Sequence, residues 1–231
     1  MIENIKDEIL ECADPIRAKH SLRFFKTGKG DYGEGDKFLG LSVPQQRSIS
    51  IKYKDLSIEE LVELIKSEFH EHRLTALFII VNRFKKSKIE SERKELIDFY
   101  LANTKYINNW DLVDCSASIL GNYLFEKDRK LLIELAKSKL LWDQRISIIA
   151  TSYFIARGEY QDTFKISEIL LTHKHDLIHK AVGWMLREVG KKDLNAEIEF
   201  LDKYYTTMPR TMLRYAIERF PEKLRLHYLS R

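Results

Sequence analysis

A tryptophan and an aspartate one helical turn apart carry the strongest chemical signal in this sequence. Trp110 and Asp114 lie on the same side of a predicted helix, and the small residues Ala117 and Gly121 continue that arc. A single carboxylate beside an aromatic ring cannot perform the paired acid–base hydrolysis of most glycosidases, but it can stabilise a developing cation and orient a water. The pattern matches cleavage of an N-glycosidic bond through an oxocarbenium-like sugar. The alternative interpretation is a core tryptophan and a surface aspartate.

A second tryptophan lies outside the apolar arc of its own predicted helix. Trp184 has Lys180 four residues before it and Arg187 three residues after it. An exposed indole between cations is a good surface for stacking on a sugar or a base next to phosphates. Arg145, in a Trp-Asp-Gln-Arg sequence, adds a further basic side chain.

Basic residues recur at a regular interval. Arg73, Arg145, Lys180 and Arg214 each lie early in an apolar helical segment, and they are separated by 72, 35 and 34 residues. A period of about 35 residues with two helices per repeat is typical of an α-solenoid. We therefore expect the second helices of successive pairs to bring cations to one concave face. The alternative is a coincidence among Arg-rich helices.

The positions of proline and glycine predict an all-α fold. No proline lies between residues 45 and 208, and that span contains only four glycines. Helix starts are predicted at Asp14-Pro15, at Ser42-Val43-Pro44, at the capping box that begins with Ser57, and at Asn109-Trp110-Asp111. The segment 74–84 is apolar on nearly every side, so it must be covered by other helices. We expect a single domain of HEAT-like helix pairs over residues 1–231.

A glycine-rich segment near residues 27–38 interrupts this pattern. It has four glycines between residues 27 and 37, and Lys26, Lys29 and Lys37 lie along it. Glycine allows the positive φ angles of tight turns, so the segment is expected to form a short β-hairpin or a loop insertion. Its G-x-G spacing is weak evidence for a phosphate loop, because no strand precedes it and no G-K-[ST] follows.

The charge distribution favours a polyanionic partner. The chain has 231 residues and a net charge of +4, composed of +6 in residues 15–54, +4 in residues 207–231 and −6 in the remainder. Segregated charge of this kind suits a polyanion better than an even distribution does, although solvated helix faces would also explain it. A composition of 44% hydrophobic and 32% charged residues excludes a disordered chain. No stretch reaches the roughly 18 apolar residues of a membrane span.

Cysteine and histidine give no sign of a metal or a disulfide framework. Cys12 and Cys115 are expected to be reduced thiols, and a nucleophilic role for Cys115 is disfavoured because it points away from Asp114 on the helix. The histidines near residues 70–72 and 173–179 lack the spacing of zinc ligands. We therefore expect no metal and no cofactor.

Four ordered motifs resemble the DNA alkylation repair family, the alkylpurine DNA glycosylases built of HEAT-like repeats. The motifs are Phe38-Leu-Gly-Leu-Ser-Val-Pro44, Trp110-Asp-Leu-Val-Asp114, Trp142-Asp-Gln-Arg145 and Lys180-Ala-Val-Gly-Trp184-Met-Leu-Arg187-Glu. The resemblance covers nearly the whole chain. It implies an α-solenoid whose basic concave face holds duplex DNA, and excision of cationic N3- or N7-alkylated purines without base flipping.

The resemblance also implies roles for individual residues. Asp114 matches the catalytic carboxylate of the family, and Trp110 and Trp184 match the tryptophans that contact the deoxyribose of the lesion. Arg145 matches an arginine that holds the DNA backbone. We expect further DNA contacts from the other cations of the repeat and of the glycine-rich segment, namely Lys180, Arg187, Arg73, Arg214, Lys26, Lys29 and Lys37.

The insertion at 27–38 departs from the catalytic members of the family, which run a helix almost directly into the Phe-Leu-Gly segment. Some relatives altered at this place resemble binders of branched DNA that lack glycosylase activity. Two functions therefore stay open, an alkylpurine DNA glycosylase and a non-catalytic binder of branched or distorted DNA, and a solenoid that binds protein is a third, weaker alternative. We expect a monomer in the cytoplasm, associated with the nucleoid if the source is bacterial.

Overall fold

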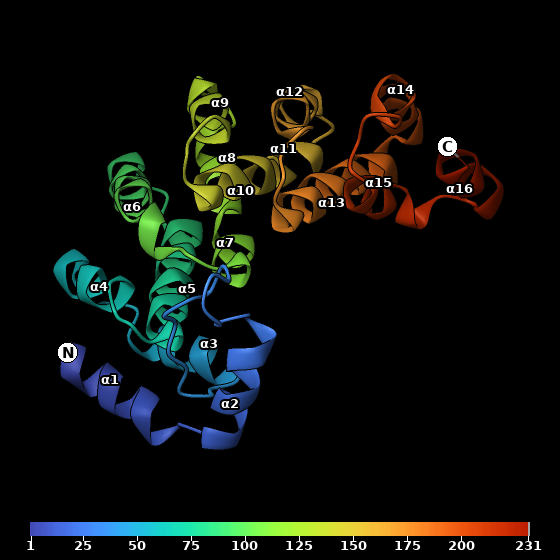
Figure 1. Ribbon diagram of the computed structural model, residues 1–231. Helices are drawn as coiled ribbons and strands as arrows, with labels where there is room; N and C mark the ends of the chain where they lie inside the picture. The colour runs from blue at the N-terminus through green and yellow to red at the C-terminus, as the bar shows by residue number, and fades with distance from the viewer. Residues whose placement is uncertain (231) are drawn as a thin grey trace. The chain divides into compact units, whose positions relative to one another are not determined.

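The computed structural model describes residues 1–230, and within them the fold is all-α with no strand. One isolated bridge joins Lys37 to Phe69. The α-helices, in chain order, are α1 (Ile2–Glu11), α2 (Pro15–Phe24), α3 (Val43–Lys52), α4 (Ile58–Ile65), α5 (His70–Lys86), α6 (Glu90–Ala102), α7 (Trp110–Ser116), α8 (Ser118–Leu124), α9 (Lys130–Ala136), α10 (Leu141–Ala150), α11 (Ser152–Ile155), α12 (Gln161–Leu170), α13 (Asp176–Lys192), α14 (Leu194–Tyr204), α15 (Arg210–Ala216) and α16 (Glu222–Leu229) (Figure 1). The prediction of an all-α fold of helix pairs is confirmed.

The contacts divide the chain into two compact units. Unit 1 comprises Met1–Ile119 and unit 2 comprises Leu120–Arg231, so the division falls within α8. None of the helices among the described residues has the length and hydrophobicity to cross a bilayer.

Unit 1 is built around α5. Residues 70–81 of this helix and Phe84 are all buried, because α3, α4, α6 and α7 cover it on several sides, as the apolar run at 74–84 predicts. Three other helices of unit 1 begin at the capping residues that the sequence predicts. The Asp14 carboxylate accepts from the backbone of α2, Ser42 forms a capping box with Gln45 at α3, and Ser57 forms one with Glu60 at α4. These caps satisfy backbone donors that the first turns leave unpaired.

Unit 2 consists of successive helix pairs. Within it, α9, α12 and α14 form one row and α10, α13 and α15 form a second row that packs side by side (Figure 1). Glycine allows the second row to approach closely, since a Cβ added at Gly183 of α13 would lie 2.4 Å from the carbonyl oxygen of Met212. This is the arrangement of stacked HEAT-like pairs, with each second helix sandwiched between its neighbours.

The glycine-rich segment is a loop of successive turns, and the hairpin alternative is not observed. Gly30 and Gly35 have φ angles of +83° and +87°, which glycine adopts without strain. The chain leaves the loop through Gly40, where φ is +90° and an added Cβ would lie 2.1 Å from the carbonyl oxygen of Asp14. The loop therefore ends in a tight approach to the start of α2 that only glycine permits.

Candidate functional site

The predicted catalytic pair lies on α7 of unit 1. Asn109 caps this helix by accepting from the backbone N–H of Trp110 at 2.9 Å. Leu112 and Val113 are fully buried and hold α7 against α5. Trp110 and Asp114 are both half-buried, one turn apart, as the sequence pattern predicts. The helix thus fixes the spacing of an indole and a carboxylate on a partly accessible surface.

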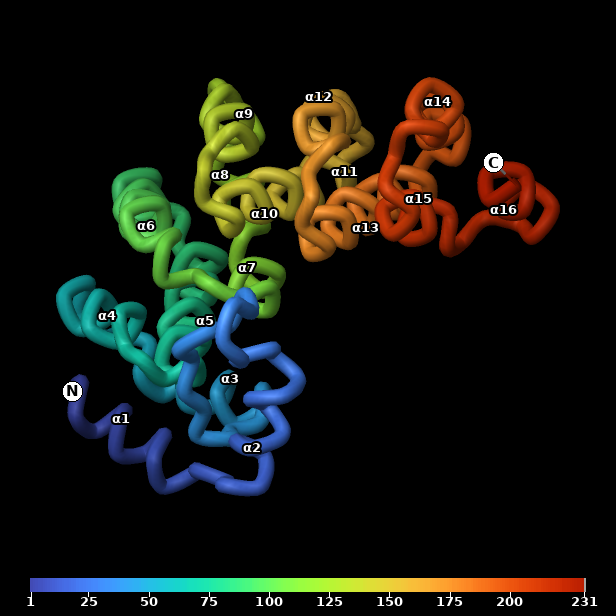
Figure 2. Tube along the Cα trace, in the orientation of Figure 1, coloured from blue at the N-terminus to red at the C-terminus, as the bar shows by residue number. Residues whose placement is uncertain are grey.

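The loop that follows α2 covers part of Trp110 with aromatic rings. Phe25 stacks on the indole with ring centroids 5.5 Å apart, and Phe24 meets it edge-on at 5.8 Å. Phe25 also stacks on Phe38 at 5.1 Å, and Phe38 stacks on the imidazole of His70 at 4.7 Å. These side chains form an aromatic cluster that joins the loop to both α5 and α7. Figure 2 shows the loop running up to the start of α7.

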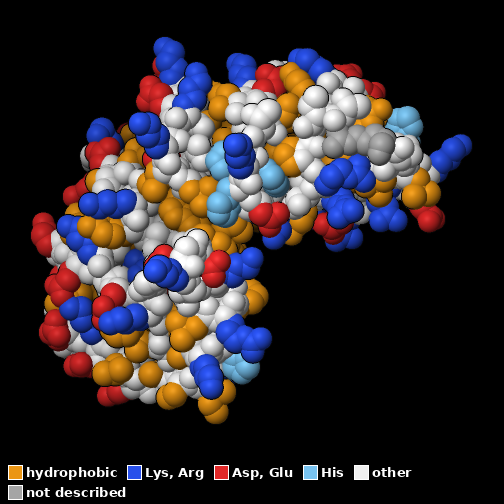
Figure 3. Space-filling model, viewed as in Figure 1, with side chains coloured by type: hydrophobic (Ala, Val, Ile, Leu, Met, Phe, Trp, Pro, Cys, Tyr) orange, Lys and Arg blue, Asp and Glu red, His pale blue; other side chains and the backbone are white. Residues whose placement is uncertain are grey.

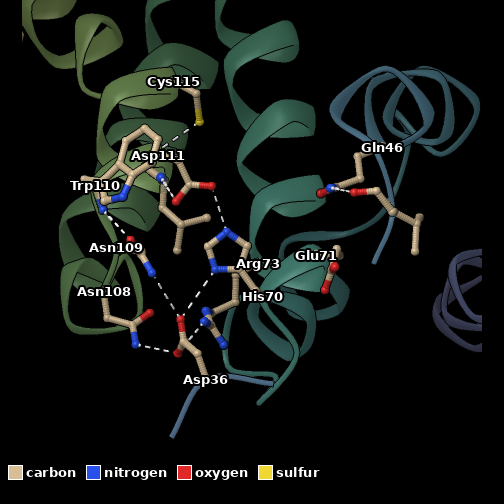
Figure 4. Close-up of polar contacts among 12 residues, drawn as sticks. Asp36, Gln46, His70, Glu71, Arg73, Asn108, Asn109, Trp110, Asp111 and Cys115 are labelled. Carbon is tan, nitrogen blue, oxygen red and sulfur yellow. Dashed lines mark hydrogen bonds and ion pairs between the residues drawn. The ribbon is translucent and has the colours of Figure 1, made fainter. Parts of the chain in front are cut away.

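A buried network of charges lies beneath the aromatic cluster (Figure 4). The Asp36 carboxylate pairs with the Arg73 guanidinium at 2.7 Å, and each side chain is only 4% exposed. His70 donates from Nε2 to Asp111 Oδ2 at 2.8 Å, and its Nδ1 faces Asp36 Oδ2 at 3.4 Å. Asn108 donates to Asp36 Oδ1 at 3.0 Å. One carboxylate from the loop and one from α7 therefore meet two cationic groups of α5.

The network shifts the pKa values of His70 and Asp36 toward their charged forms, whereas burial lowers the pKa of Arg73. Burial alone would lower the pKa of His70, but the hydrogen bond and charge of Asp111, followed by Asp36, outweigh it and raise that pKa. Burial would likewise raise the pKa of Asp36, and the hydrogen bond from His70 with the charge of Arg73 holds it below its ordinary value. Both ring nitrogens of His70 face carboxylates, which favours the imidazolium. We name Asp36, His70, Arg73 and Asp111 the charge cluster.

The predicted cations of the loop are on its surface. Lys26, Lys29 and Lys37 are all exposed. Lys37 pairs with Glu68 at 2.8 Å, next to its backbone bridge to the start of α5. The loop thus presents positive charge outward while Phe25 and Asp36 hold it inward.

In unit 2, α13 carries three of the predicted residues on one side. Lys180 pairs with Asp176 at 2.6 Å, and Trp184 donates from its ring nitrogen to Glu188 at 3.0 Å. Arg187 pairs with Glu218. All three predicted side chains are partly accessible, and Arg214 on α15 is exposed.

The comparisons with known proteins agree with this architecture. The family model described as DNA alkylation repair enzyme matches residues 5–220. The chain belongs to this family.

A solved structure of a predicted DNA alkylation repair enzyme from Enterococcus faecalis superposes with a TM-score of 0.70 and 16% identity, over 91% of this chain and 97% of that one. At that identity the likeness concerns the fold. Among curated proteins, no sequence matches.

Two of the arginines that were predicted to contact DNA, Arg73 from the regular spacing of cations and Arg145 from the family resemblance, lie inside their units. Arg73 is 3% exposed, with Nη1 donating to the Ser67 carbonyl at 2.7 Å and Nη2 against Asp36. Arg145 is 4% exposed and donates to the Leu177 carbonyl, at the beginning of α13, at 2.5 Å. Only half of the regular ladder of cations is therefore at the surface. The two buried members, Arg73 and Arg145, each donate to a backbone carbonyl at or just before the start of a second helix, α5 and α13 respectively.

Sequence reasoning did not find the charge cluster or the aromatic cover of Trp110. The only signal was the run His70-Glu-His-Arg73, four polar residues in a helix that had to be buried all round. Buried charges require partners. That requirement indicates a charge network at this place without identifying Asp36 or Asp111 as the partners.

The remaining reactive groups do not form a second site. Burial raises the pKa of the Cys115 thiol, whose Sγ donates to the Leu112 carbonyl at 3.3 Å, so this thiol stays protonated. In the described part of the chain, no three histidine, cysteine or acidic side chains are arranged to hold a metal.

Proposed function

We propose that this chain hydrolyses the N-glycosidic bond of N3- or N7-alkylated purines in DNA, as a monomer in the cytoplasm, associated with the nucleoid if the source is bacterial, and without a cofactor. The observation that carries the proposal is the half-buried pair of Trp110 and Asp114 on α7, in a chain of the DNA alkylation repair family. A partly buried carboxylate interacts with a developing cation more strongly than one in bulk water.

The reaction needs no general acid, because an alkylated purine already carries a positive charge. When the C1′–N bond breaks, its electron pair neutralises the base, which leaves as a neutral purine. Asp114 stabilises the cation that develops on the sugar and positions a water whose oxygen bonds to C1′. The proton of that water passes to the carboxylate and then to solvent. Trp110 adds cation–π stabilisation to the sugar, so a shallow site suffices and the base is not extruded into a pocket.

Surface cations and an indole supply the contacts to DNA in this proposal. On unit 1 these are Lys26 and Lys29 of the loop, which are exposed. On unit 2 they are Lys180, Trp184 and Arg187 of α13, together with Arg214 of α15. Lys37 is a further phosphate contact if DNA displaces Glu68. Arg73 and Arg145 act as positioning residues that hold α5 and α13, since both guanidinium groups are buried. Binding should therefore weaken steeply as salt rises.

A second function is favoured by one specific observation, the packing of Phe24 and Phe25 on Trp110. A ring already covered by two phenylalanines has less surface to offer to a deoxyribose. This supports a non-catalytic protein that binds branched or distorted DNA through the concave face and the segment of residues 27–38. The two functions differ in whether the base is released.

Base release under single-turnover conditions tests the first function. The substrate is a duplex with one N7-methylguanine, and the variant is Asp114→Asn, with Asp55→Asn as a matched control because Asp55 is 75% exposed on its side chain. We expect the Asp114 variant to release base about 10²- to 10³-fold more slowly, the usual effect of losing one electrostatic stabiliser. Release at the spontaneous rate by the native chain would refute the glycosylase.

Competition between a four-way junction and the intact duplex tests the second function. The second function would replace the first if two results are found together. The native chain releases no base, and it prefers the junction in a way that Lys26→Ala/Lys29→Ala abolishes. Equal affinity for junction and duplex would refute it.

A further inference from the structure

Helix α2 is attached to unit 1 along one narrow edge. Three residues in or just after α2 are half-buried on the side that faces the loop, namely Ala18, Ser21 and Phe25. No residue of α2 is fully buried. These positions are three and four residues apart, so they form a single stripe. The approach of Gly40 fixes this stripe, since an added Cβ there would lie 2.7 Å from the Ala18 nitrogen. The rest of the helix surface faces outward.

A hollow runs along the outward side of α2. It has a volume of about 460 Å³ and is lined by Pro15, Ile16, Lys19, His20 and Arg23. Ile16 is 73% exposed. A hollow lined by apolar and cationic side chains can take a ligand that combines a flat apolar ring with negative charge. Its size is within the range of ligand sites, about 300–1,000 Å³.

The charged side chains that line the hollow, Lys19 and Arg23, are cationic, and the adjoining carboxylate of Asp14 pairs with Arg17 at 3.4 Å. Residues 15–30 contain five Lys or Arg side chains and no acidic residue. A second copy of this chain, docked symmetrically, would place these cations against each other, so it is not the occupant. Figure 3 shows basic, histidine and hydrophobic side chains interleaved over the region that α2 occupies in Figure 1.

The interleaving also distinguishes between two anionic partners. A helix that lies on a membrane separates its apolar and basic side chains onto opposite faces. On α2, the cations Lys19 and Arg23 instead lie on the same arc as Ile16, and Phe24 adjoins them. A nucleic acid alternates bases and phosphates at short intervals, so this arrangement fits it better.

We propose that the hollow on α2 binds one unpaired nucleotide of DNA, its base against Pro15, Ile16 and His20 and its phosphates on Lys19 and Arg23. This inference rests on the proposed function only in taking DNA as the partner. It names the substrate class as DNA with an unstacked nucleotide, such as a bulge, gap or branch point. Phe24, 65% exposed, connects the hollow to Trp110, because its ring lies 5.8 Å from the indole in the same unit.

The test measures binding to a short duplex with one bulged 2-aminopurine, against the same duplex without the bulge. Every protein carries Asp114→Asn, so that no base is released. The variants are Ile16→Ser, which removes an apolar side chain of the lining, and Lys19→Ala/Arg23→Ala, which removes the phosphate contacts. Matched controls are Ile51→Ser, at a residue 59% exposed, and Lys85→Ala/Lys88→Ala, which removes two exposed cations outside α2. All these positions are exposed, so the variants fold.

The native surface should bind the bulge at least about fivefold more tightly than the intact duplex, the smaller limit for stacking one base on a side chain. Ile16→Ser should lose most of that preference, whereas Lys19→Ala/Arg23→Ala should lower the salt slope by about 1.4, from two single-strand phosphate contacts. Quenching of 2-aminopurine should weaken in both variants and not in the controls.

Equal losses in variants and controls, or no preference for the bulge, would overturn the inference. Tighter binding of phosphatidylserine vesicles than of the bulge, lost in Lys19→Ala/Arg23→Ala, would replace DNA with a membrane surface and overturn it too. If the native chain releases base but shows no preference for the bulge, the nucleotide site on α2 is refuted and the glycosylase is not. A bulge preference without base release by the native chain refutes the glycosylase alone.

Discussion

Replacing Asp36 by asparagine tests whether charge holds the loop of residues 25–38 onto the rest of unit 1. The Asp36 carboxylate contacts Arg73 at 2.7 Å, His70 at 3.4 Å and Asn108 at 3.0 Å. An asparagine of the same shape keeps one oxygen as an acceptor and removes the negative charge. Arg73 and His70 then lose the carboxylate that the loop supplies, in a site from which water is nearly excluded.

The structure sets the expected magnitude. Removing one partner of a buried ion pair costs about 3–5 kcal/mol, because the other charge is left uncompensated. Arg73 keeps its hydrogen bond to the Ser67 carbonyl, and His70 keeps Asp111, so we expect the lower end, about 3 kcal/mol. That is a large part of the roughly 5–15 kcal/mol that stabilises a typical domain.

Urea unfolding followed by tryptophan fluorescence measures this loss, with Asp31→Asn as the control. Asp31 is exposed in the same loop, and its substitution should change stability by no more than about 0.5 kcal/mol. Trypsin cleavage after Lys26 and Lys29 provides a local readout, and it should accelerate in Asp36→Asn only. A loss no larger than that of the control, with unchanged cleavage, would refute the reasoning. The double variant Asp36→Leu/Arg73→Met should be less destabilised than Asp36→Asn, because no uncompensated arginine remains.

Four further predictions concern pH, close packing and the loop. Because folding raises the pKa of His70, the stabilisation of the folded state by its protonated ring is complete below the ordinary pKa near 6.5. That stabilisation is lost as the pH rises through the folded-state pKa. The urea midpoint should therefore fall between pH 6 and pH 9, and less so in His70→Gln. Burial raises the pKa of Glu197 to about 9, so Glu197→Gln should stabilise the protein by about 3 kcal/mol at pH 7 and by only about 1 kcal/mol at pH 5, again by urea titration. Gly183→Ala should destabilise the protein by more than about 1 kcal/mol in the same assay, because the new Cβ meets the Met212 carbonyl at 2.4 Å, whereas Gly28→Ala in the exposed loop should be neutral. Deleting residues 28–32 should leave the circular dichroism melting curve unchanged, since the Gly33 nitrogen already donates to the Lys26 carbonyl at 3.2 Å, and a loss of several degrees would contradict this.

The elements could be predicted from sequence wherever their determinants are local. The caps of Ser42 and Ser57 act over three residues, and each helix begins where the cap-then-proline pattern at Ser42 or the capping box at Ser57 predicts. The burial of residues 74–81 and Phe84 in α5 follows from the apolar composition of that segment. The family resemblance was likewise carried by short motifs, and the family model confirms it.

The charge cluster could not be predicted, because its members are far apart in the chain. Asp36 is 34 residues from His70, and His70 is 41 residues from Asp111, and no helical period relates such positions. The same dependence on distant partners explains why only some of the regularly spaced cations are at the surface. Arg73 and Lys180 occupy equivalent early positions in their helices, yet one is buried and the other accessible. The difference lies in a tertiary partner, since Asp36 neutralises Arg73 inside unit 1.

The glycine-rich loop is therefore part of the packing around α7 as well as a departure from the family pattern. Its two ends supply Phe25 and Asp36 to the clusters that cover Trp110 and hold α5, whereas its middle carries Lys29 to the surface. Any effect of the insertion on catalysis should then act through the accessibility of Trp110, and any effect on DNA binding through charge. Because different residues carry these two effects, substitutions at Phe25 and at Lys29 can separate them. A tryptophan that the loop partly covers is compatible with either proposed function, and the release of base distinguishes between them.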